Sequence, residues 1–249
     1  MNIKTRSTQT FFILLAILAL AAALNPFLPQ GELGTVAPES QIPAWQLALG
    51  SAAITTALYG LLGFLGLTLW RRLGFPEIWA ENVTNRQRFF IPAIAGGALG
   101  LALIISDLIF SRFNGVGRLV HPPFPTSLVA SISAGIGEEM MFRLFFVSFW
   151  TWLVGKVILR GRGLGAVYWV VSVFSAIAFA ASHLPSLMMV FGVSDPSQFS
   201  PALLLEILLF NGLISIVAAY FFKKFGFLAP VGIHFWTDIV WHMLWGLAG

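Results

Sequence analysis

Cysteine is absent from this 249-residue chain, and charged residues make up only 10% of it. Without cysteine there is no disulfide framework, no thiol nucleophile and no thiolate metal site. Soluble domains carry about 25% charged residues, so the low charge content excludes an ordinary soluble domain. Hydrophobic residues account for 58% of the chain. The composition therefore predicts a polytopic integral membrane protein.

Basic residues outnumber acidic ones by 14 to 10, which gives a net charge of +4. They lie in short loops between apolar runs and form no basic stripe, so nucleic-acid binding is not predicted. Loop charge instead predicts orientation, because cytoplasmic loops are enriched in Lys and Arg. One side would carry Lys4, Arg6, Arg71, Arg72, Arg86, Arg88, Lys156, Arg160, Arg162, Lys223 and Lys224, and the other only Arg112 and Arg118. We therefore predict a cytoplasmic N-terminus and a C-terminus on the outer side.

Apolar runs long enough to span a bilayer, about 20 residues each, recur along the whole chain. They lie at 9–28, 44–70, 89–110, 125–155, 166–190, 201–222 and 228–248. The predicted fold is an all-α transmembrane helical bundle of about seven spans, within a range of six to eight. We expect N-terminal helices in 1–124 and a catalytic helical core in 125–249, which together form one membrane domain. The expected location is the cytoplasmic (inner) membrane of a prokaryote.

The first apolar run has two interpretations. A basic start followed by a short apolar core is also typical of a signal peptide. Pro26 and Pro29 follow this run without a polar cleavage region, which favours a retained helix over residues 1–28. Cleavage would leave six spans with the same topology.

The stretch "GEEMMFRLFF" at 137–146 places Glu138, Glu139 and Arg143 inside an apolar run. Each charge at bilayer depth costs about 2.5–3.5 kcal/mol on insertion scales. Residues four apart share a helix face, so Glu139 and Arg143 can pair, whereas Glu138 faces elsewhere. One carboxylate would then be structural and one left over. The alternative is a salt-bridged helix contact that uses all three charges.

Histidines occur in two further apolar runs. "FAASHLP" places Phe179 and His183 on one helix face, and Pro185 predicts a helix end or kink there, with the next residues dipping back as a re-entrant segment. "HFWTDIVWH" places His234 and Asp238 four residues apart, followed after four more by the last histidine of the chain, which we expect to lie outside any site. The alternatives are a satisfied interfacial histidine in the first run and a helix–helix hydrogen bond in the second.

The depths of these residues agree. At about 1.5 Å per helical residue, Glu138, His183 and His234 lie roughly 18, 22 and 15 Å from the cytoplasmic interface. A core about 30 Å thick places all three near its middle, so one shared site is possible. Asp107 and Glu206 lie near the outer ends of their runs and are interpreted as interface residues, as is Arg112; His121 is expected in an outer loop.

Three motifs now form a recognisable series. "EEMMFR", "FAASH" and "HFWTD" occur in this order on separate predicted helices. They resemble the CPBP family of CAAX-protease and bacteriocin-processing proteins, also called the ABI family, whose eukaryotic relatives are the CAAX prenyl protease 2 enzymes. The resemblance covers roughly residues 125–245, and its motifs are individually weak but strong together.

The resemblance implies an intramembrane endopeptidase that hydrolyses peptide bonds of membrane-associated substrates. Glu138 would be the catalytic acid/base, and His183 would hold the water. His234 and Asp238 would stabilise the oxyanion, and the supporting residues would be Glu139, Arg143 and Phe179. This family pattern often has asparagine at position 238, and an ionised Asp238 cannot donate a hydrogen bond to an oxyanion. The implied partners are a membrane protein or lipidated peptide and the lipid bilayer, with no nucleic acid.

Cofactor use is open between two chemistries. Glu138, His183 and His234 would make a His₂Glu zinc set with one open position, and the family is often labelled metalloprotease. A metal-free glutamate peptidase is the preferred interpretation, because few carboxylates remain to support metal ligands. No His-Glu-x-x-His, Gly-x-Gly-Asp or Gly-x-Ser-x-Gly motif occurs. The competing functions are an inert membrane scaffold or assembly factor of the same family and a transporter.

Overall fold

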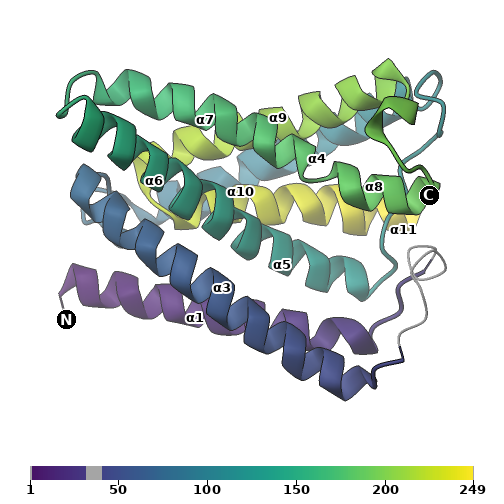
Figure 1. Cartoon of the computed structure of the whole chain (residues 1–249), viewed down its shortest axis with the longest axis horizontal. Coiled ribbons are helices and arrows are strands. Elements are labelled where there is room, and N and C mark those ends of the chain that lie inside the picture. The colour runs from purple at the N-terminus through teal and green to yellow at the C-terminus, as the bar shows by residue number, and fades with distance from the viewer. Residues whose placement is uncertain (1, 32–40, 249) are drawn as a thin grey trace.

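The computed structural model describes residues 2–31 and 41–248, and every regular element in these residues is helical. The first half contains α1 (Ile3–Leu24), η1 (Asn25–Phe27), α3 (Ala44–Leu73), η2 (Arg86–Phe90) and α4 (Ile91–Phe110) (Figure 1). One long helix follows as α5 (Thr126–Glu139), η3 (Met140–Val147), α6 (Ser148–Trp150) and η4 (Thr151–Ile158). The last part contains α7 (Leu164–Ala181), α8 (Leu184–Phe191), η5 (Pro196–Gln198), α9 (Pro201–Phe225), α10 (Leu228–Asp238), η6 (Ile239–Trp245) and α11 (Gly246–Ala248).

Six helices among the described residues are long and apolar enough to cross a membrane. They are Ile3–Phe27, Ala44–Leu73, Arg86–Phe110, Thr126–Ile158, Leu164–Phe191 and Pro201–Phe225. The seventh predicted run is helical from Leu228 to Ala248, but it includes polar residues such as His234 and Asp238 and is not among the six. The all-α bundle and its predicted range of spans are confirmed, and the chain is an integral membrane protein.

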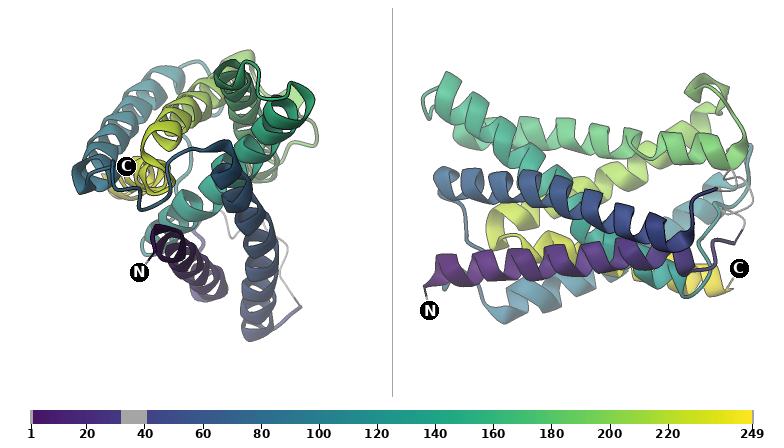
Figure 2. Two further views of the ribbon diagram at one scale, coloured as in Figure 1. Left: turned by 90° about the vertical axis from the view of Figure 1, so that its left-hand side faces the viewer. Right: turned by 60° about the horizontal axis from the view of Figure 1, so that its bottom comes forward.

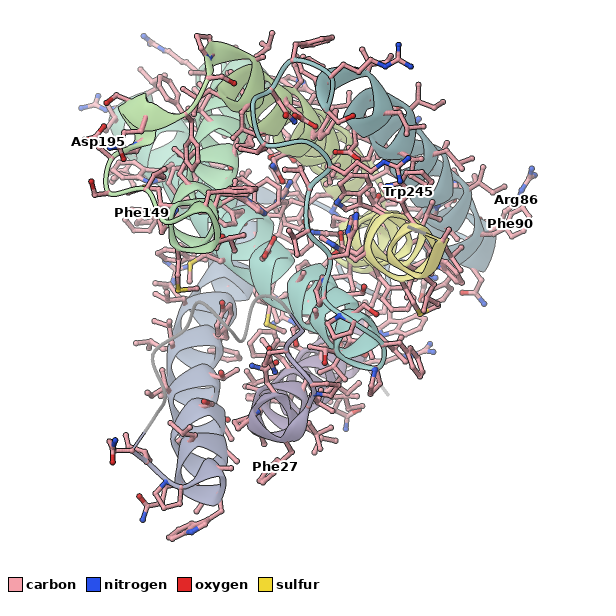
Figure 3. All side chains as sticks on the ribbon, turned by 90° about the vertical axis from the view of Figure 1, so that its right-hand side faces the viewer. Phe27, Arg86, Phe90, Phe149, Asp195 and Trp245 are labelled. Atoms are coloured by element: carbon pink, nitrogen blue, oxygen red, sulfur yellow. The ribbon has the colours of Figure 1, made fainter. Side chains whose placement is uncertain are left out.

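The polar helix α10 lies in the interior of the bundle. It packs against α4, α5 and α9, while α1 pairs with α3 and α7 with α9 (Figures 1 and 2). Apolar side chains on the outer helices point away from the bundle: Phe27 and Phe90 are 59% and 60% exposed (Figure 3). Exposed apolar side chains of this kind are suited to contact with lipid. The bundle thus places the polar side chains of α10, such as His234 and Asp238, away from lipid.

The two chain ends lie at opposite ends of the bundle (Figure 1). At the N-terminal end Arg71 forms an ion pair with Glu77, Nε to Oε1 2.7 Å, and donates to the carbonyl of Lys4 at 3.0 Å. The guanidinium of Arg6 lies 3.9 Å from the centre of the Trp79 ring. Basic residues of the N-terminal segment and of the last turn of α3 therefore share one end, as the charge pattern indicated. That this end faces the cytoplasm stays a prediction.

The first helix is packed into the bundle. Phe11, Leu15 and Leu18 of α1 are buried, and α1 contacts both α3 and α5. The helical conformation predicted for this run is therefore present. Its retention in the mature protein stays a prediction.

Glycines of α4 allow unusually close contact with α10. A Cβ atom at Gly96 would lie 2.3 Å from the carbonyl oxygen of Ile233, and one at Gly100 would lie 2.8 Å from that of Thr237. The hydroxyl of Thr237 also donates to the carbonyl of Gly96 at 3.1 Å. Small residues spaced four apart are a common means of close helix packing in membranes. This contact fixes the position of α10 and of the polar side chains that it carries.

Two helices change geometry next to their polar residues. The α-helix α5 ends at Glu139 and continues as the π-helix η3, and α10 ends at Asp238 and continues as the π-helix η6. The sequence pattern predicted plain α-helices here. π-Helical segments often occur at functional sites, but η2 and η4 are π-helical as well, so this geometry does not by itself mark a site.

Candidate active site

A cavity of about 260 Å³ lies among α5, α8, α9 and α10 and the segment that precedes α5. Most of its wall is aliphatic or aromatic. Its polar wall residues are Glu138, His183, Ser186, Asn211, His234, Asp238 and His242. The four residues predicted to be catalytic therefore line one cavity, which agrees with the common depth derived from the sequence.

Two adjacent glutamates at the end of α5 have different surroundings. Glu139 is fully buried, and its Oε2 lies 3.2 Å from the Nε of Arg143, which is also fully buried. The side chain of Glu138 is 34% exposed and lines the cavity. The predicted pairing of Glu139 with Arg143 is confirmed, and it leaves Glu138 as the more accessible acid.

Three carboxylates surround the imidazole of His234. Its Nδ1 lies 2.9 Å from Oε1 of Glu139. Its Nε2 lies 3.5 Å from Oε2 of Glu138 and 3.7 Å from Oδ2 of Asp238. Because a carboxylate only accepts hydrogen bonds, Nδ1 carries a proton that it donates to Glu139. His234 is thereby oriented with Nε2 toward the other two acids.

Glu139 joins Arg143 to His234, and the sequence pattern did not indicate the second contact. One carboxylate oxygen faces the guanidinium and the other faces the imidazole. The two partners are separated by 91 residues of sequence, and neither helical spacing nor composition relates them. A buried charge needs a partner, and here the same carboxylate has two.

Phe179 packs between the charged groups of this cluster. Its ring centre lies 4.9 Å from the Arg143 guanidinium carbon, 5.0 Å from the His183 ring and 5.6 Å from the His234 ring. Both imidazoles meet it edge to face, and a cation near an aromatic ring is attracted by the ring electrons. The predicted supporting residue thus contacts both histidines and the arginine.

His183 lies where the fifth membrane helix breaks. α7 ends at Ala181 and α8 begins at Leu184, so the predicted break is present. The Nδ1 of His183 lies 2.8 Å from the carbonyl oxygen of Phe179. Nδ1 therefore donates, which leaves Nε2 as an acceptor when the ring is neutral. Among the described residues, no hydrogen bond or ion pair joins His183 to Glu138 or His234.

The predicted re-entrant segment is wrong. α8 continues from α7 toward the end of the bundle where the C-terminus lies and does not fold back (Figure 1). Pro185 sits in the first turn of α8, where its missing N–H is not needed for a helical hydrogen bond. A proline that starts a new helical segment produces a kink here without reversing the chain.

His242 and Asn211 also line the cavity, although the sequence pattern placed neither in the site. The Nδ1 atoms of His242 and His121 lie 3.1 Å apart, so one imidazole donates to the other. His121 lies in the loop between α4 and α5, as predicted, and burial lowers its pKa to about 4. That this loop is on the outer side stays a prediction. The sequence feature that could have indicated Asn211 is its position as a single amide within the apolar stretch 201–222.

Asp107 and Glu206 are interpreted from the sequence as interface residues, and their depth in the membrane stays a prediction. Both lie near the outer ends of their helices but are fully buried within the protein. Asp107 Oδ1 accepts from the backbone N–H of Leu119 at 3.2 Å, and Glu206 Oε2 accepts from Asn114 Nδ2 at 2.9 Å. The loop between α4 and α5 folds over these carboxylates, which depth along the helix could not indicate.

The proposed zinc ligands do not converge as a ligand set. Within residues 2–31 and 41–248, no group of three or more His, Asp or Glu side chains is placed to hold a metal ion. The Nδ1 of His183 is directed at a carbonyl, and the Nε2 of His234 is approached by two carboxylates. We therefore derive no chemical step through a metal.

The fold and this cavity define a class of protein, namely a helical integral membrane protein with a buried acid–histidine cluster. Residues 120–240 match the family model Rce1-like, described as type II CAAX prenyl endopeptidase Rce1-like. The chain thus carries an Rce1-like domain and matches the CPBP/CAAX protease family, as the three motifs indicated. Comparisons with curated proteins and with solved structures gave no match.

The family match supports peptidase activity in general. It begins close to the predicted division between 1–124 and 125–249, and it includes all four predicted catalytic residues. The division into two parts and the role of each residue stay predictions.

Proposed function

We propose that this chain is an intramembrane endopeptidase in which Glu138 activates a water molecule. The observation that supports this most is the division between the two adjacent acids. Glu139 is buried between Arg143 and His234, whereas Glu138 lines the cavity and approaches only the Nε2 side of His234. One carboxylate is thus free to exchange a proton with water, and the other holds the histidine in place.

The proposed reaction uses Glu138 as base and then as acid. Glu138 takes a proton from water while the water oxygen attacks the carbonyl carbon of the substrate. The tetrahedral intermediate collapses with cleavage of the C–N bond, and Glu138 returns its proton to the leaving nitrogen. The sum is one peptide bond and one water converted to a carboxylic acid and an amine. His183, half-buried in the same cavity wall, is proposed to hold the water.

The negative charge on the substrate oxygen needs a hydrogen-bond donor. His234 provides one when Nε2 carries a proton, because Nδ1 already donates to Glu139. Asp238 can assist only in its protonated form. Its Oδ2 lies 3.7 Å from the same Nε2, so its second possible role is to orient the imidazole. Glu139, Arg143 and Phe179 are proposed to position His234.

The proposed substrates are membrane proteins or lipidated peptides within the bilayer. The cavity lies among membrane-spanning helices, and its wall is mostly apolar. An apolar peptide segment could therefore enter without losing contact with an apolar environment. A prenylated substrate, which the family description suggests, is one member of this class. The cytoplasmic membrane of a prokaryote remains the proposed location.

The test is cleavage of a membrane-embedded peptide by the purified protein in lipid vesicles. We expect cleavage by the wild type and none by Glu138→Ala. An inert scaffold would cleave no peptide in either form. A transporter would cleave no peptide and would move a solute or protons across the vesicle membrane. Equal cleavage by wild type and Glu138→Ala would overturn the proposed role of Glu138.

A further inference from the structure

Asn211 lies in the middle of α9, within the apolar stretch "LLLEILLFNGLISIV". It lines the same cavity as Glu138 and His234. Polar groups inside membrane helices are costly unless they are paired, and they commonly mark functional positions. Asn211 has no part in the reaction described above, so its presence in the cavity wall needs a separate explanation.

The carboxamide of Asn211 is held in one orientation. Its Nδ2 donates to the carbonyl oxygen of Ile207 at 3.0 Å, one helical turn earlier. A carboxamide can donate two hydrogen bonds and accept two. The Asn211 side chain makes only this hydrogen bond with the residues that the structure describes. One N–H and the Oδ1 atom are therefore available to another molecule.

The available groups match the polar groups of a peptide bond. A peptide bond offers one N–H donor and one C=O acceptor, and Asn211 offers one acceptor and one donor. A carboxamide has the further property that it does not change charge with pH. In this respect it differs from the carboxyl and imidazole groups of the same cavity wall.

The position of Asn211 also suits substrate binding. Glu138 reaches the cavity from α5, His234 and Asp238 reach it from α10, and Asn211 reaches it from α9. The polar groups thus approach the same space from three helices. An extended peptide in this space would need partners for its backbone groups, since the rest of the wall is mostly apolar.

We propose that Asn211 binds the main chain of the peptide substrate and positions the scissile bond near Glu138. This inference rests on the proposed peptidase function and assigns a substrate-binding residue to the same cavity. Its N–H would donate to a substrate carbonyl, and its Oδ1 would accept from a substrate N–H. Recognition through the backbone would not depend on which apolar side chains the substrate carries.

The experiment measures binding of a fluorescent apolar peptide of about 20 residues, long enough to span a bilayer. Binding is measured in lipid nanodiscs with Glu138→Gln protein, so that cleavage cannot interfere. Adding Asn211→Leu, which is close in size, should weaken binding about tenfold, because two neutral hydrogen bonds are lost. Asn211→Asp keeps the shape but loses the N–H donor, and it should also weaken binding.

The matched control is Ser186→Ala. Ser186 lines the cavity, but its hydroxyl donates to the His183 carbonyl at 2.8 Å, so its loss should leave peptide binding unchanged.

A second measurement uses peptides in which an ester replaces one backbone amide. A purely structural role of Asn211 would not change how binding depends on the position of the ester. With Asn211 present, one ester position should weaken binding several-fold, because the ester cannot donate. With Asn211→Leu, the same ester should cause no further loss. Equal binding with and without Asn211, or an identical ester profile in both proteins, would overturn the proposal, and so would failure of the peptide to bind.

The two proposals can fail separately. If the wild type cleaves its peptide and Asn211→Leu binds it normally, the peptidase function stands and the role of Asn211 is wrong. If Asn211 governs binding and the wild type cleaves nothing, the binding site stands and the peptidase function is wrong.

Discussion

Two groups of buried acids occur in this bundle, and their partners differ in kind. In the inner group, Glu139 contacts an arginine and a histidine, and Glu138 faces the cavity beside the same histidine. In the outer group, Asp107 and Glu206 accept hydrogen bonds from a backbone N–H and an amide of the loop above them. The inner acids contact charged or ionisable side chains, and the outer ones accept hydrogen bonds from neutral amide groups.

The difference shows that burial of a carboxylate does not by itself indicate chemistry. Asp107, Glu206 and Glu139 are all fully buried, whereas the proposed catalytic acid Glu138 is not. What distinguishes Glu138 is access to a cavity and proximity to an oriented imidazole. The outer acids instead hold the loop whose residue Leu119 forms part of the cavity wall. They support the site from outside it.

The largest expected effect separates the two groups directly. Glu138→Gln should lower peptide turnover by about 10²–10⁴-fold, the contribution typical of a general acid–base group, while the thermal unfolding temperature stays close to that of the wild type. Glu206→Gln is the matched control, because it makes the same chemical change in the outer group. Its turnover should stay within a few-fold of the wild type. A similar loss of turnover in both variants would remove the distinction between the groups.

Arg143→Ala should show the largest change in stability. It leaves Glu139 buried without its guanidinium partner, and breaking a buried pair in this way costs about 3–5 kcal/mol. Arg71→Ala is the comparison, since the Arg71–Glu77 pair is partly exposed and water can reach Glu77 after the change, so a smaller loss of stability is expected. Denaturant or thermal unfolding in detergent measures both variants. Normal stability of Arg143→Ala together with complete loss of turnover would assign Arg143 to the chemistry instead.

A pair of glycines tests how far the inner group depends on helix packing. Gly96→Ala should destabilise the protein and lower turnover, because its Cβ would lie 2.3 Å from the Ile233 carbonyl oxygen of α10. Gly97→Ala is the matched control: a Cβ there meets nothing within 4 Å, and alanine in a helix is favoured over glycine by about 1 kcal/mol. The two variants should therefore change stability in opposite directions. A stabilised Gly96→Ala protein would contradict the close α4–α10 contact.

A smaller effect is expected from the outer loop as pH falls. Burial lowers the pKa of His121 to about 4, from an ordinary value of 6.5. The unfolded chain therefore binds this proton at a higher pH than the folded protein does, so stability should decrease as pH falls from about 6.5 to about 4. Above pH 6.5 His121 is neutral in both states and contributes no pH dependence. His121→Gln should flatten this part of the stability profile, measured by thermal unfolding at several pH values, and an unchanged slope would show that His121 is not responsible.

The sequence predicted the parts of this structure that depend on local pattern. Apolar runs gave the helices, and the four-residue spacing gave the Glu139–Arg143 pair, because both follow from the geometry of one helix. The contact of Glu139 with His234 joins helices far apart in the sequence, so no spacing could indicate it. The same holds for Gly96 against Ile233 and for Asn211. Depth alone did not indicate that Asp107 and Glu206 are buried, since position along a helix does not say whether a loop covers it.

The last prediction concerns metal, where the smallest change is expected. In the proposed metal-free reaction, a strong chelator should leave turnover unaltered, and added zinc should not raise it. Turnover should depend on pH as a bell-shaped curve, because the reaction needs both a base and an acid. A zinc enzyme would lose activity to the chelator and regain it with zinc, because zinc would activate the water directly.

Elemental analysis of active protein is the deciding measurement. About one zinc per chain, with distances of about 2.0–2.2 Å to Glu138, His183 and His234, would require His183 and His234 to move toward a common ion. Their roles would then change from acid–base and donor groups to ligands, and the contrast with the outer acids would remain.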